Sequence, residues 1–495
     1  MQIEALVSLA GYFILMMAIG LYAYKKSTDD VSGYMLGGRQ LGPAVASLSA
    51  GASDMSGWML MGLPGAIFLT GLSEAWIAVG LLIGAYFNYR LVAPRLRVYT
   101  EIADDAITIP DFLEKRFGDT SRILRILSAV VIVVFFTLYT SAGVVSGGKL
   151  FEASFGLDYQ LGLFLTAGVV VAYTLFGGFL AVSLTDFVQG CIMFIALVLV
   201  PIVTMMQLGG PTETVTAVAT AFPERLQFFP EAWTGMAIVG IISTMSWGLG
   251  YFGQPHIIVR FMAVRSLKDV PTMRRIGMGW MLTTVIGAVA TGTAGLAYAT
   301  ANNLDVADSE TIFIILSQVL FHPYIAGFLL AAILAAIMST ISSQLLVSSS
   351  SLTEDFYKAF LRRDAKQGEL VLVGRLSVLA VSLVAIFLAF DRSSNILTLV
   401  SNAWAGFGSA FGPVILLSLF WRRMTRSGAV AGMIAGSVTV LIWIYGLGLS
   451  GVMYEMVPGV IVCTVVSVLV SRISAKPTGR PVEHFDAMLE ALKRG

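Results

Sequence analysis

A run of small and polar residues interrupts an apolar stretch near the start of the chain. Gly51 and Gly57 flank Ser53, Asp54 and Ser56. Glycine lets a backbone unwind locally, so this segment can offer free carbonyls to a cation and free amides to an anion. The alternative is a glycine-kinked packing helix. A carboxylate at mid-span is costly unless it is used, which favours a binding site.

A second interruption mixes glycines with polar and aromatic side chains between positions 243 and 256. Trp247 and Tyr251 are four residues apart, so on a helix they would share a face. An aromatic stripe at a membrane interface would give the same spacing. His256 fits a structural hydrogen-bonding role better than a ligand role.

Hydroxyl side chains gather in a third apolar segment at Ser339, Thr340, Ser342 and Ser343. A small hard cation binds oxygen ligands without a fixed transition-metal geometry. The cluster therefore predicts a sodium-like site beside the carbonyls of the first interruption. Each hydroxyl taken alone could instead bond its own helix or a neighbouring one.

Other chemistry-bearing residues are sparse. Asp186 begins an apolar run, where it could be an interfacial anchor or could attract a cation. Cys191 and Cys463 are far apart, and the three histidines do not cluster, so neither an enzyme nor a metal centre is indicated.

The elements that must position these residues are membrane helices. Of 495 residues, 57% are hydrophobic and only 12% are charged, with a mean hydropathy of +0.84, whereas soluble domains carry roughly 25% charged residues. The net charge of +1 gives no sign of a nucleic-acid partner. Apolar runs predict an all-α integral membrane protein with about 13 transmembrane helices, which start near positions 4, 41, 74, 122, 160, 184, 233, 276, 322, 370, 394, 428 and 454. A short surface helix is predicted within 109–125.

Every second connection between these helices is basic, which marks the cytoplasmic side. The basic residues are Lys25, Lys26 and Arg39; Arg95, Arg97, Lys115, Arg116, Arg122 and Arg125; Arg260, Arg265, Lys268, Arg274 and Arg275; Lys358, Arg362, Arg363 and Lys366; Arg422, Arg423 and Arg426; and those of the tail from Lys476 to Arg494. An odd helix count then places the N-terminus outside and the C-terminus in the cytoplasm.

The interrupted helices 2 and 7 each begin a block of five, helices 2–6 and 7–11. An odd number of crossings gives the blocks opposite orientations, and paired broken helices in inverted halves point to a transport site. The predicted divisions are a first helix and loop (1–40), inverted repeat 1 (41–208), inverted repeat 2 with connecting loops (209–427), two C-terminal helices (428–473) and a cytoplasmic tail (474–495).

Several long motifs resemble the sodium/solute symporter family, and within it the bacterial members that carry proline. They include YMLGGR (34–39), LSAGASDMSGWMLMGLP (48–64), WGLGYFGQPH (247–256) and WAGFGSAFGP (404–413). The resemblance implies a five-plus-five inverted-repeat core in the bacterial cytoplasmic (inner) membrane. It also implies Na⁺ as the coupling ion, L-proline as the solute, membrane lipid as the surroundings and no organic cofactor.

Site residues follow from the same resemblance. The main sodium site would use the carbonyls of Ala52, Met55 and Ala336 and the hydroxyls of Ser339 and Thr340, with Asp54 organising it. The solute pocket would use Ser56, Gly57, Trp58, Tyr139, Trp247, Tyr251 and Pro255. A second cation site would use Asp186, Ser342 and Ser343, and Arg39 would be a functional loop residue.

Three other functions remain open from the sequence. The chain could be a Na⁺-coupled symporter for another small metabolite, a transporter-like solute sensor or a channel. Paired broken helices favour alternating access over a channel.

Overall fold

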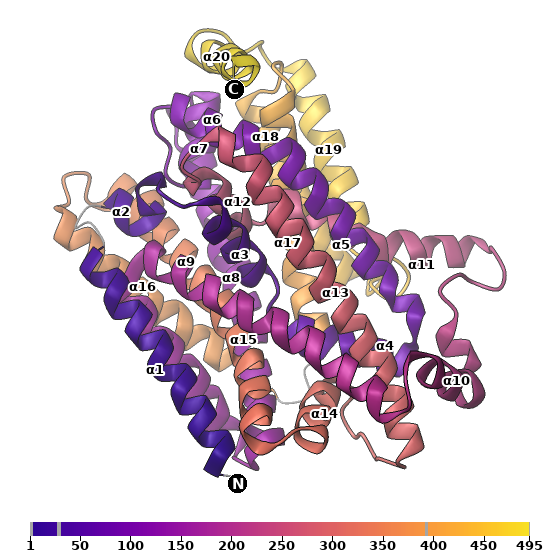
Figure 1. The fold of residues 1–495 in the computed structure, drawn as a ribbon. Coiled ribbons are helices and arrows are strands. Elements are labelled where there is room, and N and C mark those ends of the chain that lie inside the picture. The colour runs from indigo at the N-terminus through magenta and orange to yellow at the C-terminus, as the bar shows by residue number, and fades with distance from the viewer. Residues whose placement is uncertain (1–2, 27–30, 392–394, 495) are drawn as a thin grey trace.

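The computed structural model describes residues 3–26, 31–391 and 395–494, and within these ranges the fold is all-helical. The one backbone bridge among them joins Leu41 and Val264. In Figure 1, α20 (Arg480–Arg494) caps one end of the bundle and α1 (Ile3–Lys26) begins at the other.

The remaining helices are, in chain order, α2 (Val31–Leu36), α3 (Pro43–Asp54), α4 (Leu63–Thr70), α5 (Trp76–Phe87), α6 (Ala93–Ile102), α7 (Ile109–Phe117), α8 (Ile123–Phe155), α9 (Tyr159–Gln207), α10 (Pro211–Ala221), α11 (Gly235–Met245), α12 (Pro255–Ala263), α13 (Val270–Ala301), α14 (Ile312–Leu320), α15 (Pro323–Ser350), α16 (Gln367–Leu388), α17 (Ile396–Phe420), α18 (Arg426–Leu441) and α19 (Met456–Ile473). Segments of other helical pitch that matter below are η2 (Trp58–Gly62), η6 (Ser246–Gly253) and η9 (Ser351–Leu361).

Eleven helices in the described part of the chain are long and apolar enough to cross a membrane. Three shorter apolar segments, 58–70, 159–172 and 309–320, accompany them. A polytopic helical membrane protein is therefore confirmed. The predicted helix start near 394 falls outside the described residues, and the described part of that helix is α17.

The predicted starts near 160 and 184 differ from the structure in an informative way. Helix α9 is assigned without a gap from Tyr159 to Gln207, but Gly178 inside it has φ 59° and ψ −162°. A single glycine in this region of backbone space redirects the chain without a loop. The second segment therefore begins at the kink, a few residues before the predicted start.

The short helix predicted within 109–125 is α7, but seven of its nine residues are buried against the rest of the protein. The Thr108 hydroxyl accepts a hydrogen bond from the Asp111 amide at 3.1 Å, which caps the helix start. Gly118, with φ 59°, ends the helix in the left-handed conformation. Helix α20 packs against α6 and α7 and buries Phe485 and Met488.

Close helix approach depends on glycine where α5 meets η6. A Cβ atom at Gly84 would lie 2.1 Å from the Gly248 carbonyl oxygen, and one at Gly248 would lie 2.0 Å from the Gly80 carbonyl oxygen. Backbone atoms cannot give way as a flexible side chain can. This contact fixes the helix that carries Trp247 against α5.

Replacement of Gly84 by alanine should destabilise the protein by about 1–3 kcal/mol, because the added methyl group overpacks a backbone contact. Thermal unfolding of the purified protein in detergent measures the effect. Gly240→Ala is the matched control, since a Cβ there meets nothing within 4 Å. Equal unfolding midpoints for the two variants would contradict the packing argument.

Candidate functional site

Helix α3 stops inside the protein at the predicted interruption. Met55 leaves the helical region with φ −86° and ψ 81°, and the chain resumes as η2 at Trp58. Gly57 lies where a Cβ would come 2.7 Å from the Ser146 Oγ on α8. The interruption is therefore packed tightly against α8.

The hydroxyls of α15 reach the end of α3. The Ser339 hydroxyl donates to the Ala52 carbonyl at 2.7 Å and lies 3.1 Å from the Ala336 carbonyl. The Thr340 hydroxyl lies 3.5 Å from the Ala52 oxygen and 3.2 Å from the Ala336 oxygen. Four of the five predicted sodium ligands are thus brought together as buried oxygens.

Met55, the fifth predicted ligand, has other contacts in the structure. Its amide donates to the Gly51 carbonyl at 2.9 Å, and its sulfur lies 3.6 Å from the Thr284 hydroxyl. Met55 directly follows Asp54, and its backbone has left the helical region.

Asp54 is held by aromatic side chains at the end of α3 and is 2% exposed. The Tyr251 hydroxyl donates to its Oδ2, and the Trp58 indole donates to its backbone carbonyl at 3.3 Å. The Tyr139 hydroxyl lies 3.4 Å from that same carbonyl. The Oδ1 atom has no hydrogen-bond partner among the described residues. Asp54 therefore links the interruption to η6 and α8.

Aromatic rings surround this point, as the predicted pocket requires. The rings of Trp58 and Trp247 are 6.2 Å apart, and Trp247 stacks on Tyr454 at 5.5 Å. Trp247 and Tyr454 also line a cavity of about 370 Å³. Trp247 therefore separates this cavity from Trp58.

The expectation that Trp247 and Tyr251 share a face is wrong in detail. They lie on η6, a 3₁₀ helix with three residues per turn, so positions four apart diverge. Trp247 contacts Trp58, while Tyr251 reaches Asp54. Both still meet the interruption of α3.

Ser56 and Pro255 differ in where they lie. Ser56 is buried in the interruption, and its amide lies 3.1 Å from the Asp54 carbonyl. Pro255 begins α12 and lines a separate cavity of about 20 Å³ with Phe179 and Ser350. The structure does not bring Pro255 to the aromatic cluster.

At the predicted second cation site, Asp186 and Ser343 are joined by Arg260. The Arg260 Nη2 lies 3.1 Å from the Asp186 Oδ2 and donates to the Ser343 Oγ at 2.6 Å. The Ser342 hydroxyl instead donates to the Ser339 carbonyl at 3.1 Å. The prediction that Arg260 lies in a cytoplasmic loop is wrong, because Arg260 is on α12 and its side chain is fully buried.

Comparison with known proteins decides the family. The sequence profile of the sodium:solute symporter family matches residues 34–436. The chain belongs to the sodium:solute symporter family. The resemblance drawn from the motifs is confirmed, and the protein is a transporter rather than an enzyme.

Relatives in this symporter family extend over the whole chain. The osmoregulated proline transporter OpuE of Bacillus subtilis (strain 168) is 59% identical over 495 residues, covering 100% of both chains. The high-affinity proline transporter PutP of the same strain is 58% identical and covers 97% of this chain and 100% of its own. The sodium/proline symporter of Staphylococcus aureus (strain NCTC 8325 / PS 47) is 55% identical, covering 96% and 93%.

Solved structures share the fold of this symporter. A Na⁺-coupled sialic acid symporter in a substrate-bound outward-open state has a TM-score of 0.80 at 21% identity, covering 96% of this chain and 99% of that one. A transporter of the nucleobase-cation-symport-1 family in a closed conformation has a TM-score of 0.54 at 12% identity, covering 92% and 98%.

Arg39 ties three segments of the symporter together. Its guanidinium donates to the carbonyls of Met262 and Ala106 at 2.8 and 2.7 Å, and it pairs with Asp105 at 2.8 Å. Burial lowers the pKa of Arg39, and Asp105 opposes that shift. Arg39 thus joins the segment after α2 to the loop after α6 and to the end of α12.

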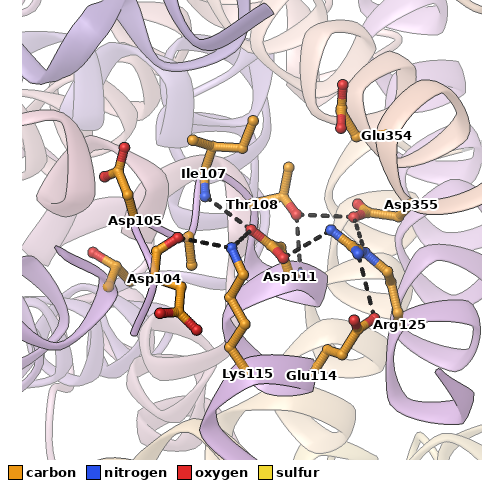
Figure 2. Close-up of polar contacts among 12 residues, drawn as sticks. Asp104, Asp105, Ile107, Thr108, Asp111, Glu114, Lys115, Arg125, Glu354 and Asp355 are labelled. Carbon is orange, nitrogen blue, oxygen red and sulfur yellow. Dashed lines mark hydrogen bonds and ion pairs between the residues drawn. The ribbon is translucent and has the colours of Figure 1, made fainter. Parts of the chain in front are cut away.

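An ion-pair cluster joins α7, α8 and η9 near α20. Figure 2 shows Arg125 between Asp111, Glu114 and Asp355, at 2.8, 3.3 and 2.9 Å. Lys115 pairs with the other oxygen of Asp111 at 2.8 Å. Burial raises the pKa of Glu114, against the opposing effect of Arg125. The cluster therefore connects three segments at this end of the bundle.

Sequence reasoning missed several buried polar side chains around the site. They are Ser49, which donates to Asp186 at 2.8 Å; Asn88, which donates to the Tyr251 carbonyl at 3.0 Å; Gln254, which donates to the Trp404 carbonyl at 3.1 Å; and Gln344, which accepts from Thr140 at 3.0 Å. For Asn88, Gln254 and Gln344 the available signal was an amide side chain inside an apolar span.

Proposed function

We propose that this chain couples inward Na⁺ movement to uptake of L-proline by alternating access. The observation that carries the proposal is full-length similarity to proline transporters at 55–59% identity. The oxygens of Ala52, Ala336, Ser339 and Thr340 would hold the ion, and the rings of Trp58, Trp247 and Tyr251 would contact the solute, both at the interruption of α3.

The sodium ion would bind where α3 meets α15, with the carbonyls of Ala52, Met55 and Ala336 and the hydroxyls of Ser339 and Thr340. The two hydroxyls now lie against the Ala52 and Ala336 carbonyls. On ion binding they would rotate their lone pairs toward Na⁺, which takes oxygen ligands. The ion would fix the end of α3.

Proline would bind beside the ion at the interruption. Its carboxylate would meet the amides of Ser56 and Gly57, because an unwound helix end turns amides toward anions. The Ser56 amide would exchange its contact with the Asp54 carbonyl for the carboxylate. The proline ring would lie against Trp58, Tyr139, Trp247 and Tyr251. These apolar faces suit a saturated five-membered ring.

Asp54 would couple the two sites. Its backbone is part of the turn that follows the Ala52 carbonyl, and its carboxylate receives the Tyr251 hydroxyl. Ordering of this turn by Na⁺ would position Tyr251 for the solute. Coupling is reciprocal, so proline must tighten Na⁺ binding by the same factor.

The proposed topology has thirteen crossings. The broken α3–η2–α4 segment and the first part of α9, up to Gly178, would add two to the eleven long helices. Helices 2–6 and 7–11 would form inverted repeats within 41–208 and 209–427, preceded by 1–40 and followed by 428–473 and the tail 474–495. The N-terminus would lie outside, and the C-terminus with the Arg39 and Arg125 contacts would lie in the cytoplasm.

Uptake by purified protein in liposomes tests the function. We expect an inward Na⁺ gradient to drive accumulation of labelled proline above equilibrium, and its collapse by a Na⁺ ionophore to release the label. Gradients of Li⁺ or H⁺ alone are run in parallel. Accumulation that needs no Na⁺, or binding without accumulation, would contradict symport, and the second result would favour a solute sensor.

Replacing Trp247 by alanine should weaken apparent proline affinity about tenfold, because a large ring leaves the pocket wall. The concentration dependence of proline uptake measures it. Trp247→Phe should retain most of the affinity, and Trp233→Ala, at a side chain 62% exposed, should change nothing. An unaltered uptake curve for Trp247→Ala would remove this residue from the pocket.

Competition by other metabolites tests the alternative solute. Unlabelled proline should displace labelled proline, whereas sialic acid, sugars and pantothenate should not. A stronger effect of one of these would identify a Na⁺-coupled carrier for another metabolite.

A further inference from the structure

The segment η6, which carries Trp247 and Tyr251, contacts both α5 and α17. The Trp404 indole of α17 donates to the Trp247 carbonyl at 2.8 Å. Asn88 directly follows α5 and begins η4 (Asn88–Val92), and its side-chain amide donates to the Tyr251 carbonyl at 3.0 Å. Side chains from outside η6 therefore bond the backbone carbonyls of both aromatic residues.

The Asn88 bond replaces one that the chain itself cannot make. Pro255 follows Tyr251 by four residues and has no amide hydrogen, so the Tyr251 carbonyl cannot accept the usual α-helical bond. Asn88 is 1% exposed and Tyr251 is 3% exposed, so water has little access to this carbonyl. A buried carbonyl without a donor costs free energy. The amide at position 88 therefore stabilises the present course of η6.

Trp404 reaches η6 at several points and is itself 1% exposed. Its ring meets the Tyr251 ring edge-on at 5.2 Å. A Cβ at Gly250 would lie 2.0 Å from the indole nitrogen, so the glycine lets the indole approach the backbone. The Trp404 carbonyl also accepts from the Gln254 amide at 3.1 Å, where η6 ends. One residue of α17 thus holds most of η6.

The course of η6 decides where two rings of the proposed solute pocket lie. The Trp247 ring is 6.2 Å from the Trp58 ring, and the Tyr251 hydroxyl donates to Asp54. A shift of the η6 backbone would move both rings. Because protein interiors are close-packed, a small shift changes the room left for a solute ring.

We propose that Asn88 and Trp404 are positioning residues that determine which solute ring size this transporter accepts. Neither is among the side chains proposed to contact the solute, and the inference rests on the proposed function. Both residues hold η6 so that the pocket fits a five-membered ring. A pocket of this kind rejects one additional methylene by about 10- to 200-fold. Loss of either bond would let η6 move and would weaken that rejection.

Competition against labelled proline, in purified protein in detergent with Na⁺ present, tests the inference. Unlabelled proline and pipecolate, its six-membered-ring homologue, give a ratio of two apparent affinities. Asn88→Leu keeps a similar volume without the donor, and Trp404→Phe loses the indole nitrogen. Each should lower the wild-type preference for proline by about fivefold or more. A purely structural defect would reduce the amount of binding protein and leave the ratio unchanged.

Two control variants remove the same kinds of bond from partners outside η6. Gln189→Leu loses a buried amide bond to the Tyr12 hydroxyl, which is 2.8 Å long. Trp76→Phe loses an indole bond to the Phe228 carbonyl, which is 2.9 Å long. Both controls should keep the wild-type ratio, and a change in them equal to that in the test variants would overturn the inference.

Thermal unfolding shows which variants are folded. An unchanged ratio in folded Asn88→Leu and Trp404→Phe would overturn the inference. If Asn88→Leu does not fold, Asn88→Ser carries the same expectation, because its hydroxyl is too short to reach the Tyr251 carbonyl. A wild-type chain that binds no proline would refute the proposed function. One that binds proline and pipecolate equally would refute this inference alone.

Discussion

Replacing Thr340 by alanine should raise the Na⁺ concentration needed for half-maximal uptake by roughly ten- to hundredfold. Loss of one hydroxyl ligand to an ion lowers the binding free energy by about 1.5–3 kcal/mol. Thr340 is 2% exposed and lies within 3.5 Å of the carbonyls of both Ala52 and Ala336. Water has little access to substitute for the lost oxygen. Uptake of proline as a function of Na⁺ concentration measures the shift.

Thr340→Ser is the matched control, because it keeps the hydroxyl and removes only a methyl group. It should behave nearly as the wild type does, while Thr340→Val, which keeps the shape and lacks the hydroxyl, should behave as alanine does. If valine and serine give the same Na⁺ dependence, Thr340 is not a ligand.

Replacing Arg125 by glutamine should open the end of the bundle that carries α7. Asp355 is fully buried and Asp111 nearly so, and Arg125 pairs with both. Removal of one partner from a buried ion pair costs about 3–5 kcal/mol, because the remaining charge is uncompensated. Parting of α7 from η9 would relieve that cost by admitting water.

The opening can be followed with a cysteine placed at Ser350, which is 6% exposed and lines the small cavity with Pro255. In a chain with Cys191 and Cys463 replaced, a membrane-impermeant maleimide should label it at least tenfold faster in the Arg125→Gln background. Arg480→Gln is the control, because Arg480 and its partner Asp104 are both exposed and such pairs contribute about 0–1 kcal/mol. Equal labelling rates would show that the cluster does not hold this end closed.

Much of the site was predictable because polar groups are expensive inside an apolar span. Ser339, Thr340 and the interruption around Asp54 stand out in the sequence for this reason, and the structure brings α15 to the end of α3. The contacts between these segments could not be predicted from the spacing alone. They follow from packing of elements almost 300 residues apart.

Arg260 shows where the sequence rules mislead. The rule that assigns Lys and Arg near helix ends to cytoplasmic loops treats each charge alone, and it cannot detect a carboxylate 74 residues away on another helix. Trp247 and Tyr251 show a different limit, because their spacing assumed an α-helical pitch that η6 does not have. The periodicity of a sequence predicts neither the contacts between distant helices nor a local change of helical pitch.

The number of Na⁺ ions that enter with each solute, of which the oxygens between α3 and α15 would hold one, sets how far a symporter can concentrate its solute. A tenfold Na⁺ gradient and 100 mV together supply about 3.7 kcal/mol for each Na⁺ that enters, which supports roughly 500-fold accumulation of a neutral solute. Two ions would support an accumulation of roughly 10⁵-fold on the same scale. A single ion held where α3 meets α15 would therefore place a ceiling on the internal solute concentration, and it would halve the Na⁺ that the cell must later pump out for each molecule imported, compared with two ions.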